Sequence, residues 1–193
     1  MLAAVTDLVA ARDSSTVTVT DVVRAAGVTR PTFYAAFGDL QTAFARAALT
    51  HVAEAFAYDE PARPAADEPE AHLRATITRA MERLEPHASF FAHVLDGAGG
   101  PAVQAQLTVE AARQLGDDAI VGAALRAGPL PLRRSTEALA AAISWELRTW
   151  FHDEDRPPPA QFAASLAALV CRLVFGGLAG GPAALDPAEG DAA

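Results

Sequence analysis

The sequence predicts an all-α protein, and two observations carry this prediction. Of the 193 residues 51% are hydrophobic, with Ala and Leu dominant and few β-branched runs outside residues 17–23; Ala and Leu favour helices, whereas β-branched residues favour strands. Apolar residues also recur at helical spacing in segments that Gly, Pro and acidic clusters separate. We expect a three-helix N-terminal domain over residues 1–48, a larger helical domain over 49–178 and a disordered tail over 179–193.

The first expected helix starts at the N-terminus, where Leu2, Val5 and Val9 fall on one face and would be buried. Met1 leads into this helix without the basic region and cleavage site of a secretory signal. Cys171 is the lone cysteine and excludes an internal disulfide. We therefore expect a cytoplasmic protein.

Residues 18–37 carry the spacing of two short helices joined by a tight turn. Thr18 is placed to cap the first of them, with Asp21 completing a variant of the capping box. Gly27 follows the apolar face of this helix, where a chain leaving a helix often needs a left-handed residue. Thr29 is a second cap, and Pro31 lies in the first turn after it, where its missing amide is harmless.

The second of these helices separates its side chains into two groups. Phe33 and Phe37 lie four residues apart and face inward, which leaves Arg30, Thr32 and Tyr34 pointing elsewhere. A helix–turn–helix of this kind places its second helix in the major groove of DNA.

At these residues the sequence resembles the TetR family of transcriptional regulators. Residues 25–29, AAGVT, resemble the family's turn, and residues 30–37, RPTFYAAF, are close to its recognition helix. The match runs without a gap from Met1 to about Leu49. It departs from the family pattern in three ways: the short basic arm is absent, Asp13 stands in place of a usual Gly, and Gly38-Asp39-Leu40 replaces a common Lys.

The resemblance makes residues 1–48 a DNA-binding domain and residues 49–178 a ligand-binding and dimerisation domain. Arg30 would bond guanine or phosphate, Thr32 a thymine methyl or base edge, and Tyr34 a phosphate. The two caps would donate to phosphates from helix N-termini; the alternative is that these residues are only caps and surface. The candidate DNA-binding residues are Thr18, Thr29, Arg30, Pro31, Thr32 and Tyr34.

The net charge of −9 is unusual for a DNA-binding protein. Residues 1–50 are balanced, because their four Arg are matched by four Asp, so the whole deficit lies in residues 51–193. A neutral head on an acidic body predicts weak non-specific DNA binding and a modest salt dependence.

The remaining segments follow in order along the chain. Residues 58–70 hold prolines and acids and indicate an exposed linker, and the GAGGP motif at 97–101 indicates a break. In the last two helices we expect an inward face with Leu139, Ile143, Leu147 and Trp150, and another with Phe162, Leu166, Leu169, Val170 and Leu173. The expected helices are 40–56, 73–86, 89–96, 103–115 with a continuation over 120–127, 132–152 and 160–175.

Two features bear on partners of the larger domain. The last two helices are rich in Ala, which lets helix axes approach closely and suits pairing with a second copy across a two-fold axis; in the TetR family these two helices usually form the dimer interface. An effector pocket or, alternatively, an ordinary core is predicted for Met81, Phe90, Phe91, Trp145 and Phe151.

Other classes of site find less support. His87, His93 and Asp96 could suggest a metal site, but a spacing of six residues does not place both His on one helix face, so a solvated or pocket-lining role is expected instead. No cofactor is expected. Cys171 is expected to be a small buried hydrophobe. No spacing indicates a catalytic triad or a phosphate loop, so an enzyme is disfavoured. The longest apolar stretch, residues 162–178, contains Ser165 and Arg172, so no membrane span is expected.

The leading hypothesis is a ligand-responsive repressor that binds a pseudo-palindromic operator as a homodimer. A small-molecule effector in the larger domain would favour a spacing of the two heads that fits DNA poorly. The alternative is a dimeric small-molecule sensor with weak or lost DNA binding, which the acidic charge and the missing basic arm suggest.

Overall fold

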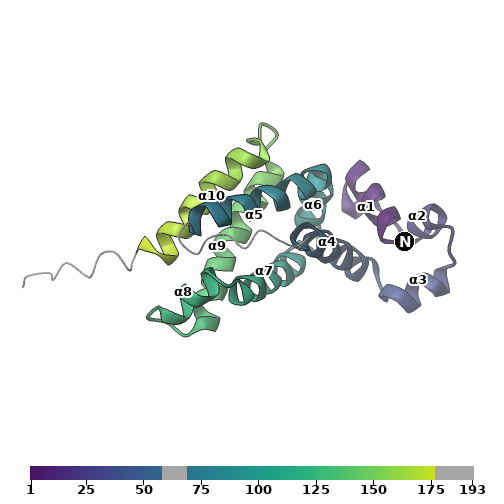
Figure 1. Ribbon diagram of the computed structural model, residues 1–193. Helices are drawn as coiled ribbons and strands as arrows, with labels where there is room; N and C mark the ends of the chain where they lie inside the picture. The colour runs from purple at the N-terminus through teal and green to yellow at the C-terminus, as the bar shows by residue number, and fades with distance from the viewer. Residues whose placement is uncertain (58–68, 177–193) are drawn as a thin grey trace, which may run out of the picture.

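The computed structural model describes residues 1–57 and 69–176. Within these ranges the chain forms α-helices and two short 3-10 helices, and no strand, so the all-α prediction is confirmed. Figure 1 shows α1, α2 and α3 at one end of the molecule and the remaining helices at the other, with α4 between them. The expected tail and most of the expected linker lie outside the described residues.

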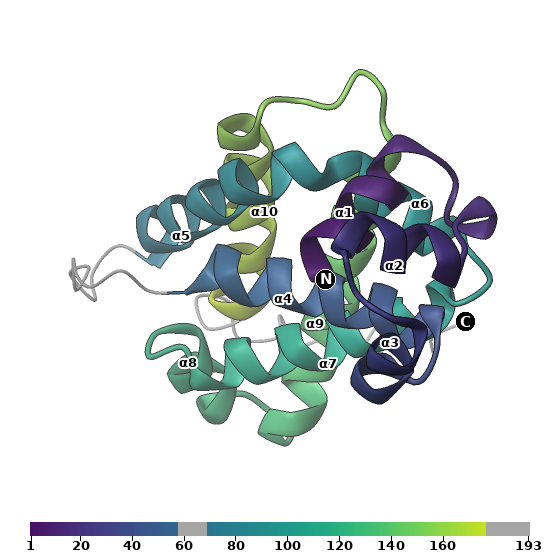
Figure 2. The same ribbon diagram turned by 90° about the vertical axis from the view of Figure 1, so that its right-hand side faces the viewer.

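The N-terminal end consists of α1 (Leu2–Ala11), η1 (Ser14–Thr16), α2 (Val19–Ala26) and α3 (Arg30–Phe37), followed by α4 (Leu40–Phe56). We call α1 to α3 the head. Val5 and Val9 of α1, Val22 of α2 and Phe33 of α3 are fully buried and form its core. Figure 2 views the molecule from this end, with α1, α2 and α3 in front of the other helices.

The expected start and stop signals of the two short helices are present. The Thr18 hydroxyl accepts from the Asp21 amide, and the Asp21 carboxylate accepts from the Thr18 amide, which makes a reciprocal capping box. Gly27 ends α2 with a φ of 64°, a left-handed conformation that glycine adopts without steric cost. Thr29 caps α3 and Asp39 caps α4, each through its side-chain oxygen.

The helices after α4 form the body. The observed bounds of its last two helices, α9 and α10, agree closely with the expected ones. In the body α10 packs mainly along α5, α7 packs mainly along α9, and α4 contacts both α5 and α7. The body helices are α5 (Pro69–Leu84), η2 (Glu85–His87), α6 (Ala88–Asp96), α7 (Gly100–Asp117), α8 (Val121–Ala127), α9 (Leu132–His152) and α10 (Pro159–Val174).

The break expected at 97–101 is shorter than predicted. Gly100 and Pro101 already belong to α7, because a proline in the first turn of a helix gives up no intrahelical hydrogen bond. Gly100 also lies so close to α6 that an added Cβ would fall 2.0 Å from the Leu95 carbonyl oxygen. The glycine pair therefore permits a close turn between two helices rather than a loop.

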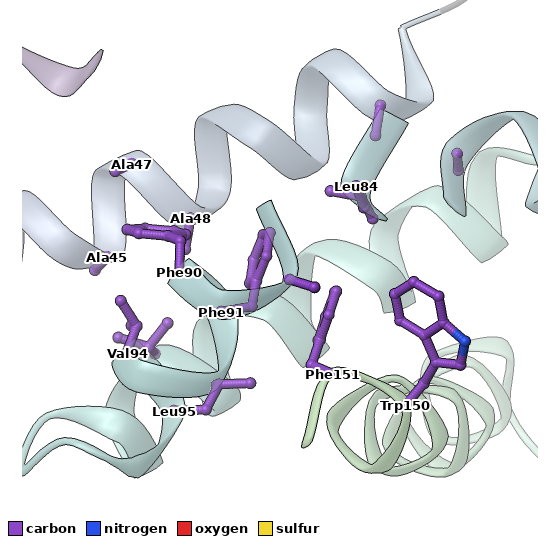
Figure 3. Close-up of a cluster of buried hydrophobic side chains, with 14 of the residues drawn as sticks. Ala45, Ala47, Ala48, Leu84, Phe90, Phe91, Val94, Leu95, Trp150 and Phe151 are labelled. Carbon is purple, nitrogen blue, oxygen red and sulfur yellow. The ribbon is translucent and has the colours of Figure 1, made fainter. Parts of the chain in front are cut away.

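Aromatic side chains form the centre of the body. Phe90 and Phe91 of α6 are fully buried, and the Phe91 ring stacks on Phe151 of α9 with centroids 4.6 Å apart. Figure 3 shows Phe90 directed towards Ala47 and Ala48 of α4, and its ring meets the His51 ring of α4 edge to face. Helix α6 therefore contacts α4 through its aromatic side chains and packs along α9.

The inward faces predicted for the last two helices are partly wrong. On α10, Phe162, Leu166 and Val170 are buried as predicted, but Leu169 is 38% and Leu173 59% exposed. The buried face of α10 includes Ala163, Ala167 and Val174 instead, because these small or β-branched residues face α5 and let the two helices pack closely. On α9, Leu139 and Trp150 are buried, whereas Ile143 and Leu147 are half-buried.

Candidate nucleic-acid interface

Helix α3, the expected recognition helix, presents an exposed polar edge above a pair of buried phenyl rings. Phe33 is fully buried and its ring packs against Phe37, with centroids 5.4 Å apart. Tyr34 is 50% exposed, although its ring edge contacts Phe33. The residues of α3 that the structure places at the surface are Arg30, Pro31, Thr32, Tyr34, Ala35 and Ala36.

Arg30 is joined to the preceding helix. Its Nη2 atom donates to the Thr20 hydroxyl at 2.7 Å, so the guanidinium lies across the junction of α2 and α3. The hydroxyls of Thr29 and Thr32 lie 2.9 Å apart, and the Thr32 amide donates to the Thr29 hydroxyl at 3.4 Å. The start of α3 therefore carries two separate polar contacts at the surface, Arg30 with Thr20 and Thr29 with Thr32.

The start of α2 carries a second polar group. The Asp21 carboxylate accepts from the Thr18 amide at 3.0 Å and from the Thr18 hydroxyl at 2.7 Å, and Arg12 forms an ion pair with it at 2.8 Å. These hydrogen bonds from Thr18, together with the charge of Arg12, lower the pKa of Asp21 below its ordinary value. Arg12 neutralises this carboxylate, which would otherwise repel a phosphate at the helix N-terminus.

Arg46 of α4 contacts the other end of α3, although in the sequence it is only one of the four Arg of residues 1–50. Its Nη1 atom donates to the Ala36 carbonyl at 2.9 Å, and its guanidinium lies 5.3 Å from the centroid of the Phe37 ring. A carbonyl in the last turn of a helix has no partner within the helix, and a cation there is favourable. No local spacing indicates this contact, because the two helices are joined by the irregular turn at Gly38.

The head is attached to the body through α1, α4 and α6. The His93 Nδ1 atom of α6 lies 2.7 Å from the Val9 carbonyl oxygen of α1, and the Ser14 hydroxyl donates to the His93 carbonyl at 2.7 Å. At the start of α4 the Gln41 side chain packs so closely on Gly99 that a Cβ there would clash with it. His93, considered above for a metal site, instead connects the head to the body.

The residues predicted to line an effector pocket do not all come together. Met81, Phe90, Phe91 and Phe151 are buried in the body core, which is where the alternative interpretation of an ordinary core places them. For Trp145 both interpretations are wrong, because its side chain is 66% exposed on α9 and lies outside that core. A cavity of about 430 Å³ lies elsewhere, lined by Pro69, Glu70, Ala71, Arg74 and Cys171. Cys171 itself is half-buried rather than fully buried.

The other two residues considered for a metal have their own partners. His87 stacks on His51, with ring centroids 3.9 Å apart. Asp96 accepts from Arg148 at 3.0 Å and lies 2.8 Å from His152. In residues 1–57 and 69–176 no group of three or more His, Cys, Asp or Glu side chains is placed to hold a metal ion. None of the helices described is long and apolar enough to cross a membrane.

The comparisons with known proteins bear on the fold. The chain combines a helix–turn–helix head, in which one edge of α3 is exposed, with an all-α body. It is similar to a TetR-family transcriptional regulator from Streptomyces coelicolor, with a TM-score of 0.61 and 20% sequence identity over 89% of this chain and 77% of that one. The chain therefore has the fold of a TetR-family regulator. No protein-family model and no curated protein matches the sequence.

Proposed function

We propose that the protein is a DNA-binding transcriptional regulator, and that residues 1–48 form its DNA-binding domain. The observation that carries this proposal is the exposed edge of α3, where Arg30, Thr32 and Tyr34 project from a helix whose opposite side is fully buried. Such an edge fits the major groove, where guanidinium and hydroxyl groups read base edges and phosphates. Thr18, Thr29 and Pro31 lie at the N-termini of the same two helices, where free amides favour phosphate.

The protein would act as a homodimer through α9 and α10. Trp145 of α9, with Leu169 and Leu173 of α10, presents large apolar side chains to solvent, and exposed apolar patches of this kind mark interaction sites. A two-fold dimer would place two recognition helices on the half-sites of a pseudo-palindromic operator. This arrangement is the reason to expect double-stranded DNA, a second copy and no membrane among the partners.

We infer further that the body, residues 49–178, binds a small-molecule effector and that effector binding releases DNA. The two heads can be held in more than one arrangement. A ligand that binds the body more tightly in one arrangement than in another shifts the population towards the arrangement that it binds more tightly. The contacts of His93 and Ser14 between α1 and α6 connect the body to the head and support this coupling. The protein would then be a cytoplasmic repressor, with no enzymatic role and no cofactor of its own.

A selection of bound genomic fragments, followed by mobility shift at low salt, tests DNA binding. On the best site we expect Arg30→Ala to weaken binding by about 10- to 100-fold, since one base-contacting Arg contributes roughly 1–3 kcal/mol. Arg113→Ala is the matched control, because Arg113 is also an exposed Arg, lies on α7 and forms ion pairs with Glu110 and Asp117 of the same helix. Unchanged binding by Arg30→Ala would contradict the assignment of α3.

The alternative is a dimeric small-molecule sensor with weak or lost DNA binding. The net charge of −9 favours it, because an acidic body repels the phosphate backbone. If no genomic fragment is retained at low salt while the protein is dimeric and folded, the sensor becomes the better interpretation.

A further inference from the structure

Two histidines stack face to face where the head meets the body. His51 lies in the middle of α4 and His87 ends η2, and their ring centroids are 3.9 Å apart with an angle of 26° between the ring planes. The His51 ring also makes edge-to-face contacts with the rings of Phe90 and Phe91, at centroid distances of 5.5 and 6.4 Å. The pair is half-buried and has apolar neighbours on the body side.

His51 also contacts α1 of the head through a hydrogen bond. The Nε2 atom of His51 lies 2.8 Å from the hydroxyl of Thr6, a nearly buried residue of α1. The Thr6 hydroxyl donates its own hydrogen to the Leu2 carbonyl at 3.2 Å, so it accepts from His51 and Nε2 carries a proton. Nδ1 is therefore the ring nitrogen that gains a proton when His51 becomes charged.

Few charged groups act on the pair. His87 opposes a charge on His51 and Glu54, one turn further along α4, favours it. Burial and then the neighbouring His87 lower the pKa of His51 below its ordinary value. Ionisable groups on the adjoining elements include Asp7 and Glu85, which are exposed on α1 and η2. Arg83 of α5 donates to carbonyls at the end of α4, and Arg46 of α4 donates to the Ala36 carbonyl. On α6, His93 contacts the Val9 carbonyl and Asp96 pairs with Arg148 and His152.

We propose that the His51–His87 stack is a proton-sensitive latch that holds α1 and α4 against η2 and α6, and that acidification opens it. Two charged imidazolium rings at stacking distance repel each other, and the neighbouring phenyl rings offer no counter-ion. The closed pair therefore takes up its second proton only at a lower pH than the separated rings do. Opening the latch takes up a proton, so a fall in pH favours the open state.

The sign and the pH window follow from this difference. Above the ordinary histidine pKa of about 6.5 both states are uncharged at these rings and the latch is unaffected. Below about 6.5 the open state gains protons first, and the equilibrium constant for opening rises by up to about tenfold per pH unit. The rise ends once the closed pair also takes its second proton. If the proposed function holds, operator binding weakens over the same window, because the two heads are no longer held in one arrangement.

Nuclear magnetic resonance titration of the five histidines of the full chain tests the latch without DNA. We expect His51 to titrate below pH 6.5, and His87→Gln, which removes one titrating ring, to raise the pKa of His51. His72 and His152, which lie beside Asp118 and Asp96, provide internal reference signals in the same spectra. A pKa of His51 at or above 6.5 in the wild-type protein would overturn the proposal, whether or not the variant folds.

Amide hydrogen exchange then tests the opening itself. Comparing pH 7.5 with pH 5.5, after correction for intrinsic rates, α1 should lose protection in the wild-type protein and keep it in His51→Gln/His87→Gln. Equal protection of α1 at both pH values overturns the latch even if operator binding is found. Loss of protection together with no DNA binding at any pH supports the latch and counts against the proposed function, so the two failures are distinguishable.

Discussion

At the scale of single residues, the candidate interface depends on contacts that the motif does not contain. The motif contains Arg30, Thr32 and Tyr34, and their spacing on α3 places them at the surface. Arg46, which caps α3 from the next helix, lies outside the motif. The hydrogen bond from Arg30 to Thr20 joins the two helices of the motif, but the motif's spacing does not specify it. Contacts between neighbouring helices depend on the angle between them, which helical periodicity does not specify.

Arg46 is expected to position the recognition helix rather than to bind phosphate. Replacing it by Met removes the hydrogen bond to Ala36 and the charge over Phe37, so operator affinity should fall about fivefold, as expected for the loss of one hydrogen bond. The slope of log affinity against log salt should stay as in the wild type. A slope smaller by about one would show that Arg46 contacts a phosphate instead.

Thr18→Ala should lower the free energy of unfolding by about 1 kcal/mol, because the variant loses the cap of α2. The Thr18 hydroxyl also donates to the Asp21 carboxylate, and the hydrogen bonds from Thr18 are the main cause of the lowered pKa of Asp21. The part of the loss that comes from this bond is present at neutral pH and disappears as pH falls through the lowered pKa of Asp21. Chemical denaturation at pH 7 and pH 3 measures the difference. Thr50→Ala is the control, since its hydroxyl only donates back to Arg46 within α4; a larger loss at pH 3 than at pH 7 would contradict the capping argument.

At the scale of helices, the sequence predicted which segments are helical better than it predicted their faces. The caps at Thr18, Thr29 and Asp39 act within four residues, so their positions can be read from the sequence. The outward faces of α9 and α10 could not be read from the sequence in this way. Trp145, Leu169 and Leu173 are apolar residues, yet they lie at the surface of the single chain. Hydrophobicity alone does not distinguish a face buried in one chain from a face that meets a second copy.

The two ends of α7 offer a matched pair of glycines. At Gly100 a Cβ would meet the Leu95 backbone at 2.0 Å, so Gly100→Ala should cost about 1–3 kcal/mol as overpacking forces a backbone shift. At Gly116 the nearest atom is a Thr136 methyl at 3.7 Å, so Gly116→Ala should stabilise the helix by about 0.5–1 kcal/mol. Thermal unfolding of both variants checks the signs; a stabilised Gly100→Ala would mean that α6 and α7 are less closely packed.

At the scale of the whole molecule, the exposed apolar residues of α9 and α10 predict the state of assembly. Trp145→Glu combined with Leu173→Glu should convert a dimer to a folded monomer, because two charges would have to be desolvated in the interface. Val109→Glu on α7, 71% exposed in the chain, should leave the dimer intact. Sedimentation velocity gives the mass and circular dichroism the helix content. A dimer that survives the double change but not Val109→Glu would place the interface on α7.

One uninterrupted helix serves both halves of the molecule, and this makes its length important. The N-terminal turns of α4 hold the recognition helix through Arg46, and its C-terminal half packs on α5 and carries His51. A helix of 17 residues is about 25 Å long and behaves as a stiff rod. Tilting such a lever by ~5° about one end displaces the other by ~2 Å. A change in the body that is too small to disturb its core would therefore move the exposed edge of α3 by more than half the rise of one DNA base pair.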